Sequence, residues 1–318
     1  MTVDLTPSFK TKSGDPITIG AGSGSKWGRS KRGDPSNEAV LNEIVDKLTY
    51  SIKVGYNHLD TAEIYTTHPE VSKAIKKSGV EREKLWITTK YFIGSFFIDK
   101  KAESPQEFLD QTLKELNTDY IDLLLIHHPF FEKEHSKNQY DVEKLWKEII
   151  EVQKTGAVRY IGVSNFDVPN LKKVIEISKS EGKEHFPVVN QIEYHAYLQN
   201  QSPDVVQFSQ ENGILVESYG PLTPLVRVVD DETKEEIVDH PLKRLLPELA
   251  TKYGRTEAQI LLRYVLQKNV LPITISSKEE RIKQAIEIYD FELSQADVDL
   301  IDSEGSKFPY RAFFKDQF

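Results

Sequence analysis

The chain has 318 residues with 41 Lys and Arg against 50 Asp and Glu, and this net charge of −9 argues against nucleic acid or an anionic membrane surface as its main partner. It contains no cysteine, which excludes disulfide bonds, thiolate metal sites and a cysteine nucleophile. The N-terminus lacks the basic and apolar regions of a signal peptide, and no apolar run approaches the ~18 residues of a membrane span, so we expect a cytoplasmic protein.

Short apolar runs alternate with longer segments of helical spacing along the chain. We interpret the runs as eight strands, near residues 17–20, 56–60, 85–90, 121–127, 160–164, 188–193, 214–219 and 270–275. About eight strand–helix units are typical of a (β/α)8 TIM barrel of ~250 residues plus insertions. We therefore predict an α/β fold, with a single TIM barrel domain over residues 1–318, an N-terminal β-hairpin and inserted loops. A doubly wound sheet is the alternative, but the glycines at 20–24 are not followed by the helix that its dinucleotide turn requires.

Local signals mark several helices and one long loop. Apolar residues at helical spacing predict a helix over 40–52. The sequence Ser-Pro-Gln-Glu at 104–107 is a capping box with Pro at the first helical position, and it predicts a helix through Leu116. Thr256 and Gln259 repeat the box before another apolar segment. The acidic segment 227–240 predicts an irregular, solvated loop.

Polar residues follow several of the predicted strands, where a TIM barrel carries its chemistry. Asp60, Lys90 and His127 end three successive strands, and Tyr65 follows in the loop after Asp60. Each has an ordinary structural explanation when taken singly. Together they suit carbonyl reduction: a charged lysine lowers the pKa of a nearby phenol, so that Tyr65 can act as an acid, while His127 bonds to the carbonyl oxygen. No side chain can supply a hydride, so a cofactor is implied.

Four stretches of the sequence closely resemble the aldo-keto reductases, in the order of that family. They are GYNHLDTAEIY at 55–65, IHHP at 126–129, GVSNF at 162–166 and NQIEYH at 190–195. The resemblance covers nearly the whole chain, and it places the family's catalytic tetrad on Asp60, Tyr65, Lys90 and His127. The ending PYRAFF at 309–314, with LQNQS at 198–202, is similar to the yeast conjugated polyketone and ketopantoyl lactone reductases.

The resemblance implies NADPH as the cofactor. The nicotinamide carboxamide would be held by Ser164, Asn165 and Gln191, with the ring stacked on Tyr219. Further cofactor contacts fall on Gly24, Ser25, Lys26, Asp60, Gly220, Leu222, Thr274, Ser276, Ser277, Lys278, Arg281 and Gln284. The chain departs from the family in a longer loop at 22–27 and in PITISSK at 272–278, where many members have Pro-Lys-Ser. The hydroxyls and cations that remain, Arg281 above all, are suited to a 2′-phosphate.

The resemblance also implies a substrate pocket lined by Trp27, Phe92, His128 and Tyr310. Aromatic walls favour flat carbonyl compounds, such as vicinal diketones and ketolactones, over sugars. The alternatives are a non-enzymatic NADPH-binding regulatory subunit, an aldose- or arabinose-type sugar dehydrogenase, and a metal-dependent isomerase or lyase. We expect no metal, because the rim offers too few clustered carboxylates and histidines. We expect a monomer or a weak homodimer whose partner is a small carbonyl substrate.

Overall fold

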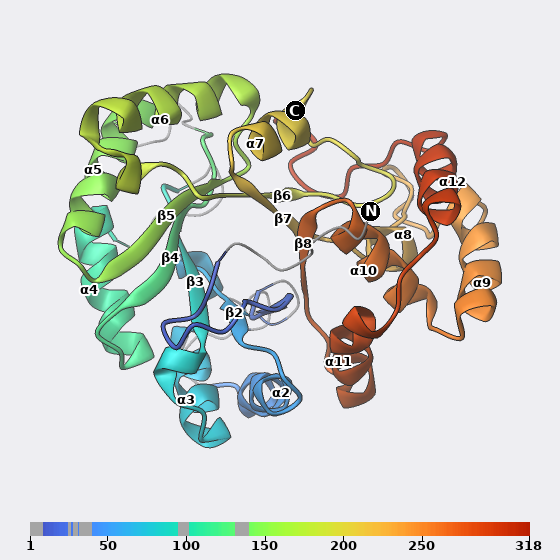
Figure 1. The fold of residues 1–318 in the computed structure, drawn as a ribbon, viewed down its shortest axis with the longest axis horizontal. Coiled ribbons are helices and arrows are strands. Elements are labelled where there is room, and N and C mark those ends of the chain that lie inside the picture. Colours follow the sequence, from blue (N-terminus) through green and yellow to red (C-terminus); the bar gives the residue numbers. More distant parts are fainter. Residues whose placement is uncertain (1–8, 25–26, 28–30, 32–39, 95–101, 131–139) are drawn as a thin grey trace.

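In the computed structural model, eight parallel strands close into a barrel, which confirms the TIM barrel and excludes the doubly wound sheet (Figure 1). The structure describes residues 9–24, 27, 31, 40–94, 102–130 and 140–318. The strands are β1 (Gly20–Gly22), β2 (His58–Asp60), β3 (Trp86–Tyr91), β4 (Ile121–Ile126), β5 (Val158–Ser164), β6 (Val189–Glu193), β7 (Leu215–Tyr219) and β8 (Val270–Thr274). Each of the eight predicted strands overlaps one of them. The barrel closes where β1 pairs with β8 as well as with β2.

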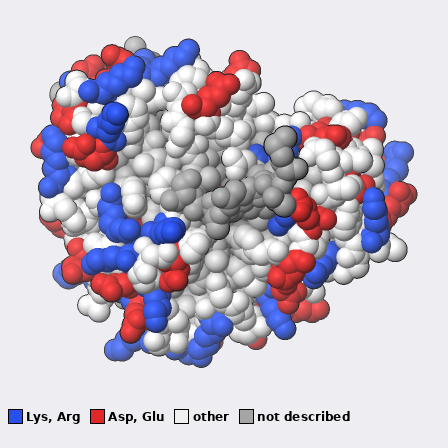
Figure 2. Space-filling view, in the orientation of Figure 1, with Lys and Arg blue, Asp and Glu red and all other residues white. Residues whose placement is uncertain are grey.

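Helices follow the strands and surround the barrel. They are α2 (Asn42–Lys53), α3 (His68–Ser78), α4 (Pro105–Leu116), α5 (Val142–Lys154), α6 (Val168–Glu181), α7 (Val205–Glu211), α8 (Thr223–Val226), α9 (Pro241–Tyr253), α10 (Glu257–Gln267), α11 (Glu279–Ile286) and α12 (Gln295–Ser306). Figure 1 shows α4 to α6 at the left of the strands, α2 and α3 below them, and α9 and α12 at the right. Within the described ranges, none of the helices is both long and apolar enough to cross a membrane. Basic and acidic side chains intermingle on the face shown in Figure 2.

The predicted helix starts are found, with one adjustment. The Ser104 side chain accepts from the Glu107 amide, but the Glu107 carboxylate accepts from the amide of Glu103 instead of that of Ser104. The box at Thr256 and Gln259 is complete, with both reciprocal bonds present. The loop predicted over 227–240 is irregular, apart from one antiparallel bridge and the short turn within it.

The N-terminal hairpin that we predicted is reduced, in the residues described, to one antiparallel bridge between Lys10 and Pro16. The turn between them contains Gly14, whose φ of +96° favours glycine. Pro16 has no amide hydrogen, so it cannot extend a ladder of backbone hydrogen bonds. Phe9 packs against Trp86, the first residue of β3, with ring centroids 5.9 Å apart. The segment therefore covers the N-terminal end of the barrel.

The strand register places polar side chains inside the barrel. Partners across parallel strands share a face, and so do residues two apart along one strand. Asp60 pairs with Thr88, which puts Lys90 on the same face as Asp60. Gln191 pairs with Glu217 on the opposite side of the barrel. These four ionisable or amide side chains therefore meet in the interior, towards the C-terminal ends of the strands.

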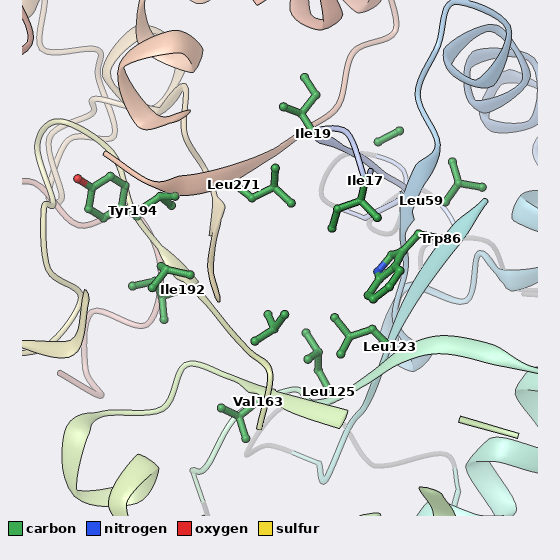
Figure 3. Close-up of a cluster of buried hydrophobic side chains, with 14 of the residues drawn as sticks. Ile17, Ile19, Leu59, Trp86, Leu123, Leu125, Val163, Ile192, Tyr194 and Leu271 are labelled. Carbon is green, nitrogen blue, oxygen red and sulfur yellow. The ribbon is translucent and has the colours of Figure 1, made fainter. Parts of the chain in front are cut away.

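Apolar residues fill the remainder of the core. Figure 3 shows labelled side chains that come from strands all round the barrel, including Leu59 of β2, Leu125 of β4, Ile192 of β6 and Leu271 of β8. All four are almost completely buried. The polar residues are thus held on a rigid, close-packed support, which suits side chains that must keep a fixed geometry.

Candidate active site

Lys90 and Asp60 form a buried ion pair at the ends of β3 and β2. Nζ of Lys90 lies 2.7 Å from each Asp60 carboxylate oxygen and 2.9 Å from the carbonyl oxygen of Thr61. Burial by itself lowers the pKa of Lys90, but the charge of Asp60, the nearby Tyr65 and the hydrogen bond to Asp60 outweigh it, so that the pKa is raised. Lys90 is therefore a cation at neutral pH although its side chain is 0 % exposed.

Gln191 links this ion pair to a second buried carboxyl group across the barrel. Its Nε2 donates to Oδ2 of Asp60 and to Oε2 of Glu217, over 2.9 Å in both cases. Burial raises the pKa of Glu217 to about 8, against the opposing effect of the Gln191 hydrogen bond. Glu217 is therefore mostly protonated at neutral pH. The sequence pattern did not indicate Glu217, because this residue lies within an apolar strand and not at a strand end.

Tyr65 ends a 3-10 turn after β2 (Glu63–Tyr65) and lies beside both Lys90 and His127. Nζ of Lys90 is 5.1 Å from the centre of the Tyr65 ring, and the His127 ring packs edge-on against it at 5.7 Å. Burial, then the charge of Lys90 and the neighbouring His128, hold the pKa of His127 well below its ordinary value. His127 is therefore neutral, with one N–H available to donate. A side chain at Gly24 would come within 2.7 Å of the Tyr65 ring, so only glycine allows this approach.

A cavity of ≈ 690 Å³ extends from this cluster to the outer helices. It begins at Asp60 and Tyr65, passes the ends of β7 and β8, and reaches α10 and α11. The volume is in the usual range for a site that binds a small molecule or a cofactor. Across the described ranges, no group of three or more His, Asp or Glu side chains is placed to hold a metal ion.

The residues expected to hold a nicotinamide are gathered at the inner end of the cavity. Gln191 and Tyr219 line it. Ser164 donates to the Gln191 carbonyl oxygen over 2.7 Å, and Asn165 accepts from the Tyr219 hydroxyl over 2.6 Å. Asn165 also has a positive φ of 62°, a strained conformation that is often found at functional sites. The structure thus brings together four residues from β5, β6, β7 and the loop after β5.

The outer end contains part of the expected phosphate site. Gly220, Leu222, Thr274, Ser276, Arg281 and Gln284 line the cavity. Ser277 and Lys278 do not line it, and Lys278 is exposed. Of the expected cofactor loop, Ser25 and Lys26 lie outside the described residues, whereas Gly24 lines the cavity.

The start of α10 also lines the outer end, through residues 256–259. Nε2 of Gln259 donates to the carbonyl oxygen of Gln284, which ties α10 to α11 beside the cavity. In the sequence, Thr256 and Gln259 are recognisable only as a helix cap. A capping box shows where a helix begins, but the cavity opposite its first turn is formed by tertiary packing.

The four residues expected to line the substrate pocket have different surroundings. Trp27 lines the cavity, and Phe92 packs against His127 and His128, with ring centroids 5.9 and 5.3 Å away. Phe92, His128 and Tyr310 do not line the cavity. The Tyr310 hydroxyl donates to the carbonyl oxygen of Arg227 and accepts from the amide of Val229, so that Tyr310 anchors the loop after α8.

Comparisons with known proteins agree with this geometry. The sequence profile described as "Aldo/keto reductase family" matches residues 16–305. The chain is 38% identical to the NADPH-dependent alpha-keto amide reductase of Saccharomyces cerevisiae, covering 89% of this chain and 85% of that protein. It is 35% identical to the NAD/NADP-dependent indole-3-acetaldehyde reductase of Schizosaccharomyces pombe, covering 87% and 89%. The structure of a Bombyx mori aldo-keto reductase in complex with NADP is similar with a TM-score of 0.74 and 29% identity, covering 94% and 92%.

Substitution Glu217→Gln tests whether this buried carboxyl group is protonated. Glu217 holds its proton up to about pH 8 in the folded protein but ionises near its ordinary value of 4.5 when unfolded. The free energy of unfolding therefore falls as the pH rises from 4.5 to 8, and it falls no further through this group above pH 8. The glutamine variant has no proton to lose. We therefore expect its free energy of unfolding, relative to that of the wild type, to rise by about 2 kcal/mol or more between pH 5 and pH 8.5.

Denaturant unfolding of both proteins at the two pH values measures this difference. Comparison at the same pH cancels the contributions of the buried histidines, which are present in both proteins. If the difference between the two proteins is the same at pH 5 and pH 8.5, Glu217 is ionised in the native state.

Proposed function

Because the chain belongs to the aldo-keto reductase family of oxidoreductases, we propose that it reduces aldehydes and activated ketones to alcohols with NADPH. The observation that carries the proposal is a single cavity that has Tyr65 and Asp60 at one end and Arg281 and Gln284 at the other. Such a cavity can place the reactive end of a dinucleotide beside an acid while its far end meets a cation.

The residues along the cavity fit NADPH. Gly22 and Gly24 line the cavity without side chains of their own, and Tyr219 offers an aromatic face at the inner end. Arg281 offers a guanidinium for a phosphate at the outer end, where Ser276 adds a hydroxyl. The relatives support the same cofactor, since one is named as NADPH-dependent and one structure is a complex with NADP. When bound, the reduced nicotinamide supplies a hydride.

The tetrad supplies the proton and fixes the carbonyl group. We propose that the Tyr65 hydroxyl donates its proton to the substrate oxygen as negative charge develops there. The Lys90 cation lies beside the ring and stabilises the phenolate that remains, while Asp60 keeps Lys90 charged and in place. Neutral His127 can donate one hydrogen bond to the same carbonyl oxygen without competing as an acid. The buried environment strengthens each of these interactions.

We propose vicinal dicarbonyl compounds and ketolactones as the favoured substrates. A neighbouring carbonyl group makes a ketone more electrophilic, so the reaction needs less help from Tyr65. Trp27 lines the cavity, and Phe92 packs edge-on against His127 of the tetrad, so that aromatic side chains lie at both places. The similarity to an enzyme named for alpha-keto amides, in which two carbonyl groups are also adjacent, supports this class. A regulatory subunit without activity and a sugar dehydrogenase are the alternatives that the experiments below distinguish.

Tyr65→Phe tests the mechanism. We expect at least a 100-fold lower kcat, because general acid catalysis contributes about 100- to 10,000-fold. NADPH affinity should change by less than about twofold, since the phenyl ring remains. Stopped-flow kinetics and fluorescence titration measure the two effects, and Lys90→Met should be comparably severe. Tyr50→Phe, which removes a hydroxyl from α2 outside the cavity, is the matched control and should keep wild-type turnover. Wild-type turnover in folded Tyr65→Phe would refute the mechanism.

Arg281→Ala tests the cofactor assignment. A charge-assisted contact to the 2′-phosphate contributes on the order of 1.5–3 kcal/mol, or roughly ten- to a hundredfold in affinity. We therefore expect the variant to lose that much affinity for NADPH and little for NADH. Lys283→Ala removes an exposed cation from the same helix away from the cavity and should affect neither. Equal losses for NADPH and NADH would show that Arg281 does not contact the phosphate.

The substrate class is tested by comparing 2,3-butanedione and a ketolactone with xylose. Burying a sugar hydroxyl without a partner costs about 1–3 kcal/mol, and xylose has several. We expect kcat/KM to be at least ~100-fold higher for the dicarbonyl compounds, which is about 2.7 kcal/mol in the transition state. Comparable efficiency on xylose favours the sugar dehydrogenase, and the absence of NADPH oxidation with every carbonyl compound favours the regulatory subunit.

A further inference from the structure

Buried amide side chains connect the inner end of the cavity to the C-terminal tail, the residues 307–318 that follow α12. Gln201 is the central one of these amides. Gln201 lies in the loop between β6 and α7 and is 2 % exposed. Its Oε1 accepts from the backbone amide of Glu193 over 2.5 Å. Its Nε2 donates to Oδ1 of Asn165 over 3.0 Å. Nδ2 of Asn165 then donates to the carbonyl oxygen of His127 over 2.9 Å.

The backbone groups at the two ends of this series determine how both amides are oriented. The Glu193 amide can only donate, so it requires the oxygen of Gln201 and turns Nε2 towards Asn165. The His127 carbonyl can only accept, so it requires Nδ2 of Asn165. Burial raises the pKa of Tyr219 well above its ordinary value, so its hydroxyl keeps its proton and donates to the same Oδ1 of Asn165. Reversal of either amide would place donor against donor at one contact and acceptor against acceptor at another.

The tail binds the same residues. A guanidinium nitrogen of Arg311 donates to the carbonyl oxygen of Gln201. The backbone amides of Ala312 and Phe313 donate to the two carboxylate oxygens of Glu193 over 2.8 and 3.0 Å. Residues 311–313 therefore stabilise both the loop that carries Gln201 and the backbone group that orients it.

We propose that Gln201 is a positioning residue, which holds the Asn165 amide with Nδ2 on the His127 carbonyl oxygen and with Oδ1 on the hydroxyl of Tyr219, a residue that lines the nicotinamide end of the cavity. It also couples that orientation to the docking of residues 311–313. This inference rests on the proposed function, since it concerns how the chain receives the carboxamide of NADPH. The coupling is reciprocal: a cofactor that selects the held orientation of Asn165 also stabilises the docked tail.

Gln201→Glu tests the positioning role. The glutamate keeps an oxygen for the Glu193 amide but presents its other oxygen to Oδ1 of Asn165, where two acceptors repel each other. We expect the dissociation constant of NADPH to rise about tenfold and kcat with 2,3-butanedione to fall by about tenfold or more. The affinity for 2′,5′-ADP, which lacks the nicotinamide, should stay within twofold. Gln207→Glu, the same change on the exposed face of α7, is the matched control and should alter none of these values.

Equal losses for NADPH and 2′,5′-ADP would show that Gln201 has only a structural role, and unchanged NADPH affinity and kcat would also overturn the proposal. If Gln201→Glu does not fold, Gln201→Met replaces it, since methionine has a similar length but neither polar atom. The proposed function is checked separately in the wild type, which must bind NADPH and oxidise it with the diketone.

Hydrogen exchange tests the coupling to the tail. In the wild type, NADPH should slow exchange of the Ala312 and Phe313 amides by about tenfold, because both donate to Glu193. Gln201→Glu should remove this protection without changing the exchange of amides in α12. Exchange at Ala312 and Phe313 that does not respond to NADPH in the wild type would overturn the coupling.

Discussion

The Lys90 ammonium is a charge whose side chain is completely buried inside the barrel, and the interior is arranged around it. An isolated buried charge is very costly, so its carboxylate partner must be close and fully bonded. Asp60 meets this demand with both oxygens, and the Thr61 carbonyl oxygen accepts a further hydrogen bond from Lys90. Gln191, on the far side of the barrel, donates a hydrogen bond to Asp60 and another to Glu217. Because Glu217 stays protonated, it adds no second negative charge.

The same electrostatic arrangement sets the chemistry at the mouth of the barrel. A fixed cation lies beside the Tyr65 ring, and burial together with that cation keeps His127 neutral. In the reaction that we propose, these two neighbouring residues take different roles: Tyr65 gives up a proton, and His127 donates a hydrogen bond. Neither role requires movement of the strands, because the residues that set the charges belong to the rigid barrel.

The outer parts of the site are built from loops and the C-terminal tail, which are irregular segments and not strands of the barrel. Tyr310 anchors the loop after α8, and Glu193 binds the amides of residues 312 and 313. The tail thus joins the loop over the cavity to the residues around Asn165. Loops are where related enzymes on one barrel differ in substrate, so in the function that we propose this arrangement connects substrate selection to cofactor binding.

The sequence by itself determined the eight strands and placed Asp60, Lys90 and His127 at their C-terminal ends, because strand patterning is local and parallel strands in a barrel end on one rim. It also determined the family, through four short motifs with Tyr65 in the first. Only the tertiary structure decided the partners of these residues. Gln191 and Asp60 are 131 positions apart, and Glu193 meets the tail 119 and 120 positions later. Such contacts depend on how the barrel closes and on where the tail crosses its rim, and no periodicity along the chain encodes either. For the same reason no local pattern indicates that Glu217 bonds to Gln191 or that Gln201 bonds to Asn165.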